Sequence, residues 1–96
     1  AILPYQPRNW VLINNLAWHL CISGGDLQQA EQLSRATIMA EPSNPVFLDT
    51  YAWILYQLED YTSAFFYIQR ALENVTDNTY KEITAHYKAI LKKLQL

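Results

Sequence analysis

The stretches NNLAW (residues 14–18) and DTYAW (residues 49–53) place the same Ala-Trp pair twice in the chain, 35 residues apart. Each pair comes before an apolar stretch and an acidic turn. Self-similarity with a period of about 20–50 residues is typical of repeat architectures, in which each repeat is one supersecondary unit. We therefore expect this period to decide the fold.

Length and composition limit the chain to one small folded domain. It has 96 residues, of which 51% are hydrophobic and 17% charged, so it can bury a core and is not expected to be disordered. The formal net charge is −2, and basic residues gather only at Lys88, Lys92 and Lys93. Since a phosphate backbone needs several well-placed cations, we expect no nucleic-acid partner.

Several classes of site are not expected. Cys21 is the single cysteine, so the chain can form neither an intrachain disulfide nor a zinc site made of cysteines. No run reaches the roughly 18 apolar residues of a membrane span. His19 and His86 have no Asp or Cys at metal-binding spacing, and no nucleophile, base and oxyanion donors come together, so we expect no cofactor and no enzyme. Because the chain starts at Ala1 rather than Met, we expect it to be a piece of a longer protein.

Hydrophobic residues recur with the 3.6-residue period of α-helices, and no segment alternates with period two. We expect five helices: one from about Trp10 to Ser23, one from Asp26 to near Glu41, and three more that begin after Asn44, Asp60 and Thr79. Asn9, Asp26, Asn44 and Asp60 are the expected N-caps, and Pro45 suits a first helical turn. Gln29 and Glu82 stand in capping-box register with Asp26 and Thr79.

Each expected helix has one apolar stripe that should face the core. In the first helix this stripe consists of Ile13, Leu16, Ala17 and Leu20. The stripes of the others are, in order, Ala30, Leu33, Ser34, Thr37 and Ile38; Leu48, Tyr51, Ala52, Leu55 and Leu58; Ala64, Tyr67, Ile68, Ala71 and Leu72; and Ile83, Tyr87, Ile90, Leu91 and Leu94.

The two halves of the chain superpose as an internal repeat of two antiparallel helices. Gly25-Asp26-Leu27 matches Glu59-Asp60-Tyr61 at a spacing of 34 residues, and Ala30 and Ile38 match Ala64 and Leu72 at the same spacing. The Ala-Trp pairs are 35 residues apart because the turn at Gly24-Gly25 is one residue longer than its counterpart.

This pattern resembles the tetratricopeptide repeat family. The family has a small residue midway along its first helix, a Gly-Asp-aromatic turn, Ala early in its second helix and Pro at its end. Ala17 and Ala52 match the small residue of the first helix, Ala30 and Ala64 match the Ala of the second helix, and Pro42 matches the final Pro. The two acidic turns match the Gly-Asp-aromatic turn. The family has one more small position in the second helix, which is Ala71 in the second repeat and Thr37 in the first.

The resemblance implies an all-α fold, a right-handed α-α superhelix of two helix-turn-helix repeats followed by a C-terminal capping helix. We divide the chain into a lead-in at 1–9, a first repeat at 10–43, a second repeat at 44–78 and a capping helix at 79–96. Lys88 stands where a small residue would receive a further helix, which suits a terminal helix with its outer side in water.

In this family the first helix of each pair lines a concave groove, which implies a protein–protein interaction module that binds a peptide or helix of a partner. One residue along a helix is a rotation of about 100°, so Trp18 and Trp53 should turn from the Ala face toward this groove. The candidate binding residues are Asn14, Trp18, Asp49, Trp53, Tyr56 and Gln57. The wider groove set adds Val11, Cys21, Ile22, Val46, Glu82, Ala85, Ala89, Lys92 and Lys93.

Two further readings of the sequence stay open. The Trp side chains could instead lie mostly in the core, and the chain could be the C-terminal end of a longer solenoid with no ligand of its own. In that second reading the chain could associate with itself, as a homodimer, through Trp10, Phe65 or Phe66. The cations with which some family members clamp a terminal carboxylate are absent from the matching positions, so we do not expect that subtype.

Overall fold

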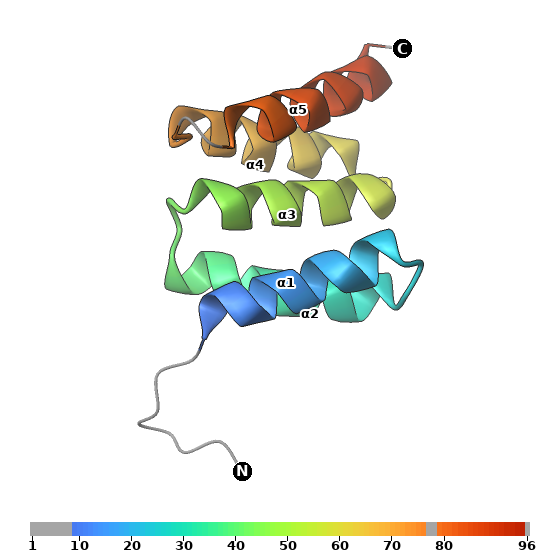
Figure 1. The fold of residues 1–96 in the computed structure, drawn as a ribbon. Helices are drawn as coiled ribbons and strands as arrows, with labels where there is room; N and C mark the ends of the chain where they lie inside the picture. The colour runs from blue at the N-terminus through green and yellow to red at the C-terminus, as the bar shows by residue number, and fades with distance from the viewer. Residues whose placement is uncertain (1–8, 77–78, 96) are drawn as a thin grey trace.

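The computed structural model describes residues 9–76 and 79–95, and all regular structure in these ranges is helical (Figure 1). The five helices are α1 (Trp10–Ile22), α2 (Leu27–Ala40), α3 (Pro45–Gln57), α4 (Tyr61–Glu73) and α5 (Tyr80–Leu94). Their bounds confirm the five expected helices to within about one residue. The lead-in up to residue 8 and the end of the second repeat at 77–78 lie outside the described residues.

Four of the five helices begin at the side-chain cap that the sequence predicts. The Asn9 side chain accepts a hydrogen bond from the Leu12 amide at 3.0 Å, and Asp26, Asn44 and Asp60 cap their helices in the same way. Pro45 occupies the start of α3, where its missing N–H has no helical partner to lose. Local capping chemistry therefore accounts for these boundaries.

The start of α5 differs from the prediction. Thr79 precedes the helix with φ −107° and ψ −2°, which is close to helical backbone, and its side chain makes no cap hydrogen bond. Its hydroxyl instead donates to the Thr76 carbonyl at 3.4 Å. The capping box expected between Thr79 and Glu82 is thus wrong, because an N-cap needs extended backbone to turn its side chain toward the helix.

The helices form two layers (Figure 1). Helices α1, α3 and α5 follow one another in the front layer, and α2 and α4 lie behind them. The most extensive packing joins α1 to α2 and α3 to α4, and α5 packs mainly on α4. Adjacent front-layer helices also contact one another, α1 with α3 and α3 with α5, so that three helices present one continuous surface.

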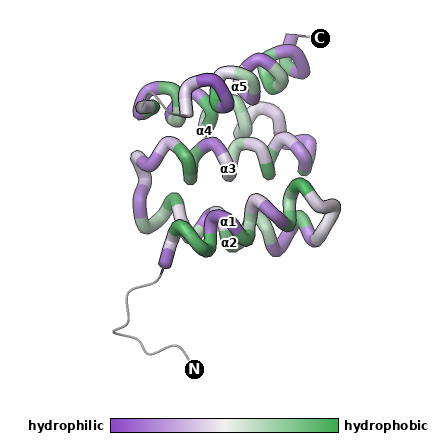
Figure 2. Tube along the Cα trace, viewed as in Figure 1, coloured by the Kyte–Doolittle hydropathy of each residue, from purple (hydrophilic) through white to green (hydrophobic). Residues whose placement is uncertain are grey.

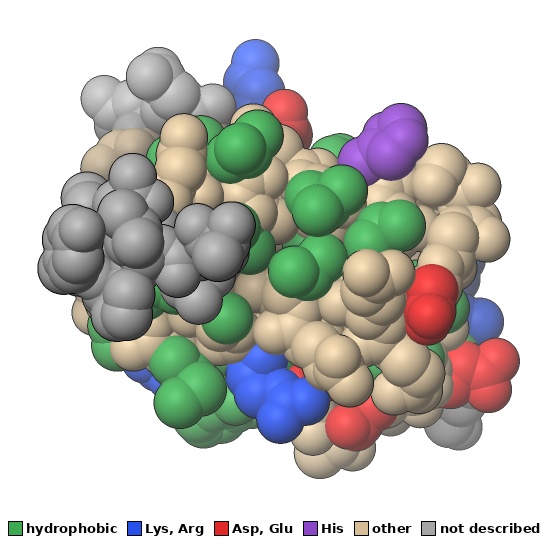
Figure 3. Space-filling model, turned by 90° about the horizontal axis from the view of Figure 1, so that it is seen from below, with side chains coloured by type: hydrophobic (Ala, Val, Ile, Leu, Met, Phe, Trp, Pro, Cys, Tyr) green, Lys and Arg blue, Asp and Glu red, His purple; other side chains and the backbone are tan. Residues whose placement is uncertain are grey.

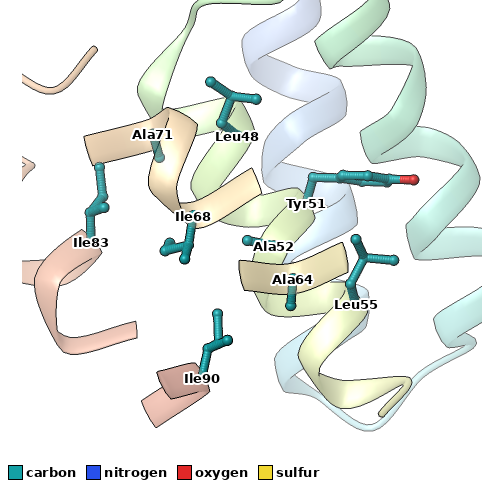
Figure 4. Packing of buried hydrophobic residues seen from close by; sticks show 9 residues of the cluster. All are labelled: Leu48, Tyr51, Ala52, Leu55, Ala64, Ile68, Ala71, Ile83 and Ile90. Atoms are coloured by element: carbon teal, nitrogen blue, oxygen red, sulfur yellow. The ribbon is translucent and has the colours of Figure 1, made fainter. Parts of the chain in front are cut away.

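The interior combines small residues at the helix crossings with large aliphatic side chains beside them (Figure 4). Ala17, Ala30, Ala52, Ala64 and Ala71 are completely buried. One cluster joins α3, α4 and α5, and a second joins α1, α2 and α3 around Ile54. The connections between helices are mainly hydrophilic (Figure 2). Small side chains let two helix axes approach to the short end of the usual range, about 8 Å.

The buried stripe of α1 lies elsewhere on the helix than the sequence predicts. Asn14, Ala17 and Cys21 are buried, whereas Leu16 is 48% exposed. Placing Leu16 in the core was therefore wrong, because α1 has no helix on the side that Leu16 faces. At the other end of the chain, Leu94 is also exposed rather than inward-facing.

The turns that join the paired helices share one backbone feature. Gly24 and Glu59 both have positive φ, 78° and 65°, and they are 35 residues apart, like the Ala-Trp pairs. The residue equivalent to Glu59 is thus Gly24 rather than Gly25, and Gly25 is the additional residue of the first turn. A non-glycine residue in this region carries local strain, which Glu59 bears and Gly24 does not.

A polar network fastens α2 to α3 on the side away from the front layer's shared surface. The Tyr51 hydroxyl donates to Glu31 Oε2 at 2.7 Å, and Arg35 donates to both oxygens of the same carboxylate. Burial alone would raise the pKa of Glu31, but these hydrogen bonds and the Arg35 charge lower it below its usual range. Burial and the Glu31 contact raise the pKa of Tyr51, so both groups keep the protonation states that the bond needs.

Enlarging a crossing residue tests the close approach of the paired helices. We expect Ala52→Leu to lower the free energy of unfolding by about 1–3 kcal/mol or more, because the added atoms have no room between α3 and α4. Ala40→Leu, at an exposed position of α2, is the matched control and should change it by less than about 0.5 kcal/mol. Urea unfolding followed by far-UV circular dichroism measures both, and equal stability of the two variants would contradict the packing described here.

Candidate functional site

Four aromatic side chains from α1, α3 and α5 form a connected series on the front layer, which we name the aromatic row: Trp18, His86, Trp53 and Tyr56. The His86 ring lies 5.8 Å from the Trp18 ring and 4.3 Å from the Trp53 ring. Trp53 also stacks on Tyr56 at 4.4 Å, with the ring planes only 13° apart. These side chains are partly buried, so the row is both a contact between helices and an accessible surface.

His86 is held in the row by a carboxylate of the neighbouring helix. Its Nδ1 lies 2.7 Å from Asp49 Oδ1, and both side chains are largely buried. A hydrogen bond to a charged acceptor is among the stronger kinds in proteins. The contact fixes the ring between Trp18 and Trp53 and fastens α5 to α3 across the front layer.

A hollow of about 150 Å³ lies at one end of the row, and we name it the acidic hollow. Its lining comes from all three front-layer helices: Asn14, Asn15, Trp18, Val46, Asp49, Thr50 and Glu82. Asn14 is only 4% exposed, and its Oδ1 has no hydrogen-bond partner. A buried acceptor without a donor costs free energy of folding. At this end of the row, the Asn14 side chain therefore has one hydrogen bond unmade.

A second hollow of about 310 Å³ lies at the Tyr56 end, and we name it the lysine hollow. Tyr56, Ala89, Lys92 and Lys93 line it. The Lys93 ammonium also lies 5.9 Å from the centre of the Tyr61 ring. The aromatic row therefore runs from an acidic end to a basic end.

The structure brings together five of the six candidate binding residues. Asn14, Trp18 and Asp49 line the acidic hollow, Trp53 continues the row, and Tyr56 lines the lysine hollow. Gln57 is exposed at the last turn of α3 and lines neither hollow.

Of the wider groove set, Cys21 is the clearest exception. It is buried beside Ala17, and burial raises the pKa of its thiol to about 11. Cys21 therefore serves the core between α1 and α2 rather than the groove. Val11 and Ile22 are exposed.

The residues considered for self-association lie apart from the row. Phe65 is partly buried and stacks on Tyr87 of α5, with ring centres 5.7 Å apart, as expected for a ring that the last helix covers. Phe66 remains 55% exposed, with Arg70 over its ring. Trp10 is half-buried beside Ile13 and Leu33 at the N-terminal end of the stack.

Sequence reasoning missed the role of His86. Asp49 and His86 are 37 residues apart, and no local spacing connects them. The repeat register gave no signal either, because it placed Glu82, Ala85 and Ala89 of the last helix on the groove but not His86. Among the described residues no three His, Cys, Asp or Glu side chains form a metal-binding group, and no helix there is long and apolar enough to cross a membrane.

Replacing His86 tests whether the Asp49 contact holds the row together. His86→Phe keeps a ring beside both Trp residues but removes the donor to Asp49. We expect the free energy of unfolding to fall by about 1–3 kcal/mol, because a largely buried carboxylate is left without its partner. A double-mutant cycle with Asp49→Asn should show a coupling of at least about 0.5 kcal/mol.

His19→Phe is the matched control, because His19 is exposed on α1 and lies outside the row. It should leave stability nearly unchanged in the same chemical-denaturation measurement. A zero coupling between His86 and Asp49 would show that the contact does not join α3 and α5.

Comparison with known proteins adds no relative. Neither a family model, nor a curated protein, nor a solved structure matches the chain. What the surface of α1, α3 and α5 can bind is therefore inferred from its own geometry.

Proposed function

We propose that the chain is a protein–protein interaction module of the tetratricopeptide repeat type, which binds a peptide or helix of a partner along its front layer. The observation that carries the proposal is the aromatic row, which three helices supply together. Tyr and Trp dominate binding hot spots because they bury a large area at a small entropic cost. The row joins two such residues of α3 to Trp18 of α1.

The helix order also supports the proposal. In a superhelix of paired helices, the first member of each pair lines the inner surface and the second member lies outside. Helices α1, α3 and α5 occupy one layer, and α2 and α4 occupy the other (Figure 1). Under this proposal the first repeat is α1 with α2, the second is α3 with α4, and α5 caps the stack with Lys88 exposed to solvent.

Removing the two α3 aromatic rings tests the proposal. The double variant Trp53→Ala, Tyr56→Ala should lose at least about 30-fold in affinity for the partner, because a single hot-spot ring contributes about 2 kcal/mol or more. The measurement is recovery of bound protein from a lysate of the source cells, with wild type and variant compared at equal loading. Circular dichroism checks that the variant keeps its helix content.

Phe66→Ala, Tyr80→Ala is the matched control, since it removes two exposed rings from outside the row. We expect it to recover the same partner as wild type. Should Trp53→Ala weaken the fold, Tyr56→Ala alone gives the milder test. A partner recovered equally by wild type and by both row variants would overturn the groove assignment.

A second candidate function is that of a structural end segment of a longer solenoid, which can associate with itself. The supporting observation is the face of α1 and α2 away from α3, which we name the N-terminal face. Leu12, Leu16 and Met39 are exposed, and a hollow of about 420 Å³ lies beside Trp10, Ile13, Leu33 and Ala36. Figure 3 shows the molecule from below, from the end at which α1 and α2 lie, and several apolar side chains are visible on that surface. Contiguous apolar surface is typical of protein contacts.

Charges placed on this face test the second candidate. If it is correct, the wild-type chain associates as its concentration rises, and Leu12→Glu, Leu16→Glu remains monomeric in analytical ultracentrifugation. Phe66→Glu is the comparison, because it places a charge at an exposed apolar residue of α4, outside the N-terminal face. A wild-type chain that stays monomeric at several hundred micromolar would contradict self-association, and loss of association only in Phe66→Glu would move the contact to α4.

A further inference from the structure

The acidic hollow is lined by two carboxylates and by no side-chain cation. Asp49 and Glu82 contribute the carboxylates, and the other lining residues are uncharged. Glu82 is exposed and forms no ion pair among the residues that the structure describes. The hollow therefore has negative charge that the described part of the chain does not neutralise with Lys or Arg.

The Asp49 carboxylate lines the hollow and keeps unused hydrogen-bonding capacity. Its contact with His86 engages Oδ1. An ionised carboxylate has two oxygens and about four acceptor positions, and no described residue donates to Oδ2. His86 thus orients the carboxylate without saturating it.

Asn14 is an independent indication that something is missing from this site. Asn14 lines the hollow, is only 4% exposed, and has an Oδ1 with no partner. The hollow therefore combines two carboxylates with an amide oxygen that has no donor. A Lys or Arg side chain offers such acceptors several donors together with a positive charge, with three N–H bonds in Lys and five in Arg.

Trp18 adds a face that favours positive charge. Its ring borders the same hollow, and indole is the aromatic side chain that attracts cations most strongly. The volume of about 150 Å³ is several times the roughly 10–15 Å³ that one water molecule needs by the same measure, so the hollow has room for a side-chain end group but not for a folded segment.

We infer that the acidic hollow binds the Lys or Arg side chain of a peptide that lies along the aromatic row. This inference rests on the proposed function for the identity of the occupant, and on the hollow's own charge for its chemistry. Asp49 and Glu82 pair with the cation, Asn14 accepts from it, and Trp18 covers its methylene groups.

The opposite end of the row fixes a second feature of the same peptide. The lysine hollow begins seven residues further along α3, at Tyr56, which is about 10 Å at 1.5 Å per residue. An extended chain covers that distance in about three residues. The bound peptide thus carries an acidic residue about three positions from its basic residue, with apolar side chains between them on the row.

The charge preference of the hollow can be measured with a probe that needs no partner. We would titrate the full chain with n-butylammonium, which represents the end of a Lys side chain, and with 1-butanol as its neutral counterpart. Two-dimensional NMR would follow the side-chain resonances of Asn14 and the indole resonances of Trp18. We expect saturable shifts of both with n-butylammonium, weakened by added NaCl, and much smaller shifts with 1-butanol.

Glu82→Gln removes one carboxylate at an exposed position and should weaken n-butylammonium binding about three- to fivefold. Asp49→Asn should have an effect at least as large, and Glu73→Gln, an exposed control on α4, should have none. Equal shifts with the amine and the alcohol, or binding unchanged in Glu82→Gln and Asp49→Asn, would overturn the inference.

The n-butylammonium titration and the partner-recovery experiment can fail independently of each other. If n-butylammonium binds as expected but the row variants still recover every partner, the cation site stands as a site for small amines and the peptide groove fails. If the row variants lose the partner while the amine shows no preference for the hollow, the groove stands and the cation site fails.

Discussion

The close approach of the paired helices is the constraint on which the rest of the structure depends. Five alanines of α1 to α4 have no exposed surface, and a larger side chain at such a position forces the packed helices to shift. When a helix packs through Ala17 or Ala52, the residue that follows this Ala points in a direction rotated by about 100° around the helix axis. The Trp residues are therefore placed on the front layer by the same sequence pair that closes the core.

The placement of the two Trp residues gives the front surface its aromatic centre. Trp18 and Trp53 come from different helices, and His86 of the last helix lies against both rings. The Asp49 contact at 2.7 Å fixes that ring. The front surface thus has a stiff aromatic centre, with acidic groups at one end and lysines at the other. In the proposed function, these rings and the charges beside them are what an extended segment of the partner contacts.

The sequence predicted local features well and long-range ones poorly. Helix ends followed from single capping residues such as Asn9 and Asp26, whose hydrogen bonds are local. The prediction that Leu16 is buried was wrong, because periodicity shows that a helix has an apolar side but does not show which neighbouring helix covers it. The contact of Asp49 with His86 depends on where α5 docks on α3, and no spacing within either helix contains that information. In the same way, no residue pattern indicated that Asn14 would be buried without a partner.

The front surface of α1, α3 and α5 depends most directly on the position of His86 between the two Trp rings. A nuclear Overhauser spectrum of the chain in solution would test this position. We predict cross-peaks from the His86 ring protons to the rings of both Trp18 and Trp53, together with large upfield shifts of the His86 ring from the neighbouring aromatic faces. Cross-peaks to only one Trp, or His86 shifts like those of an exposed histidine, would show that α1, α3 and α5 do not form one surface.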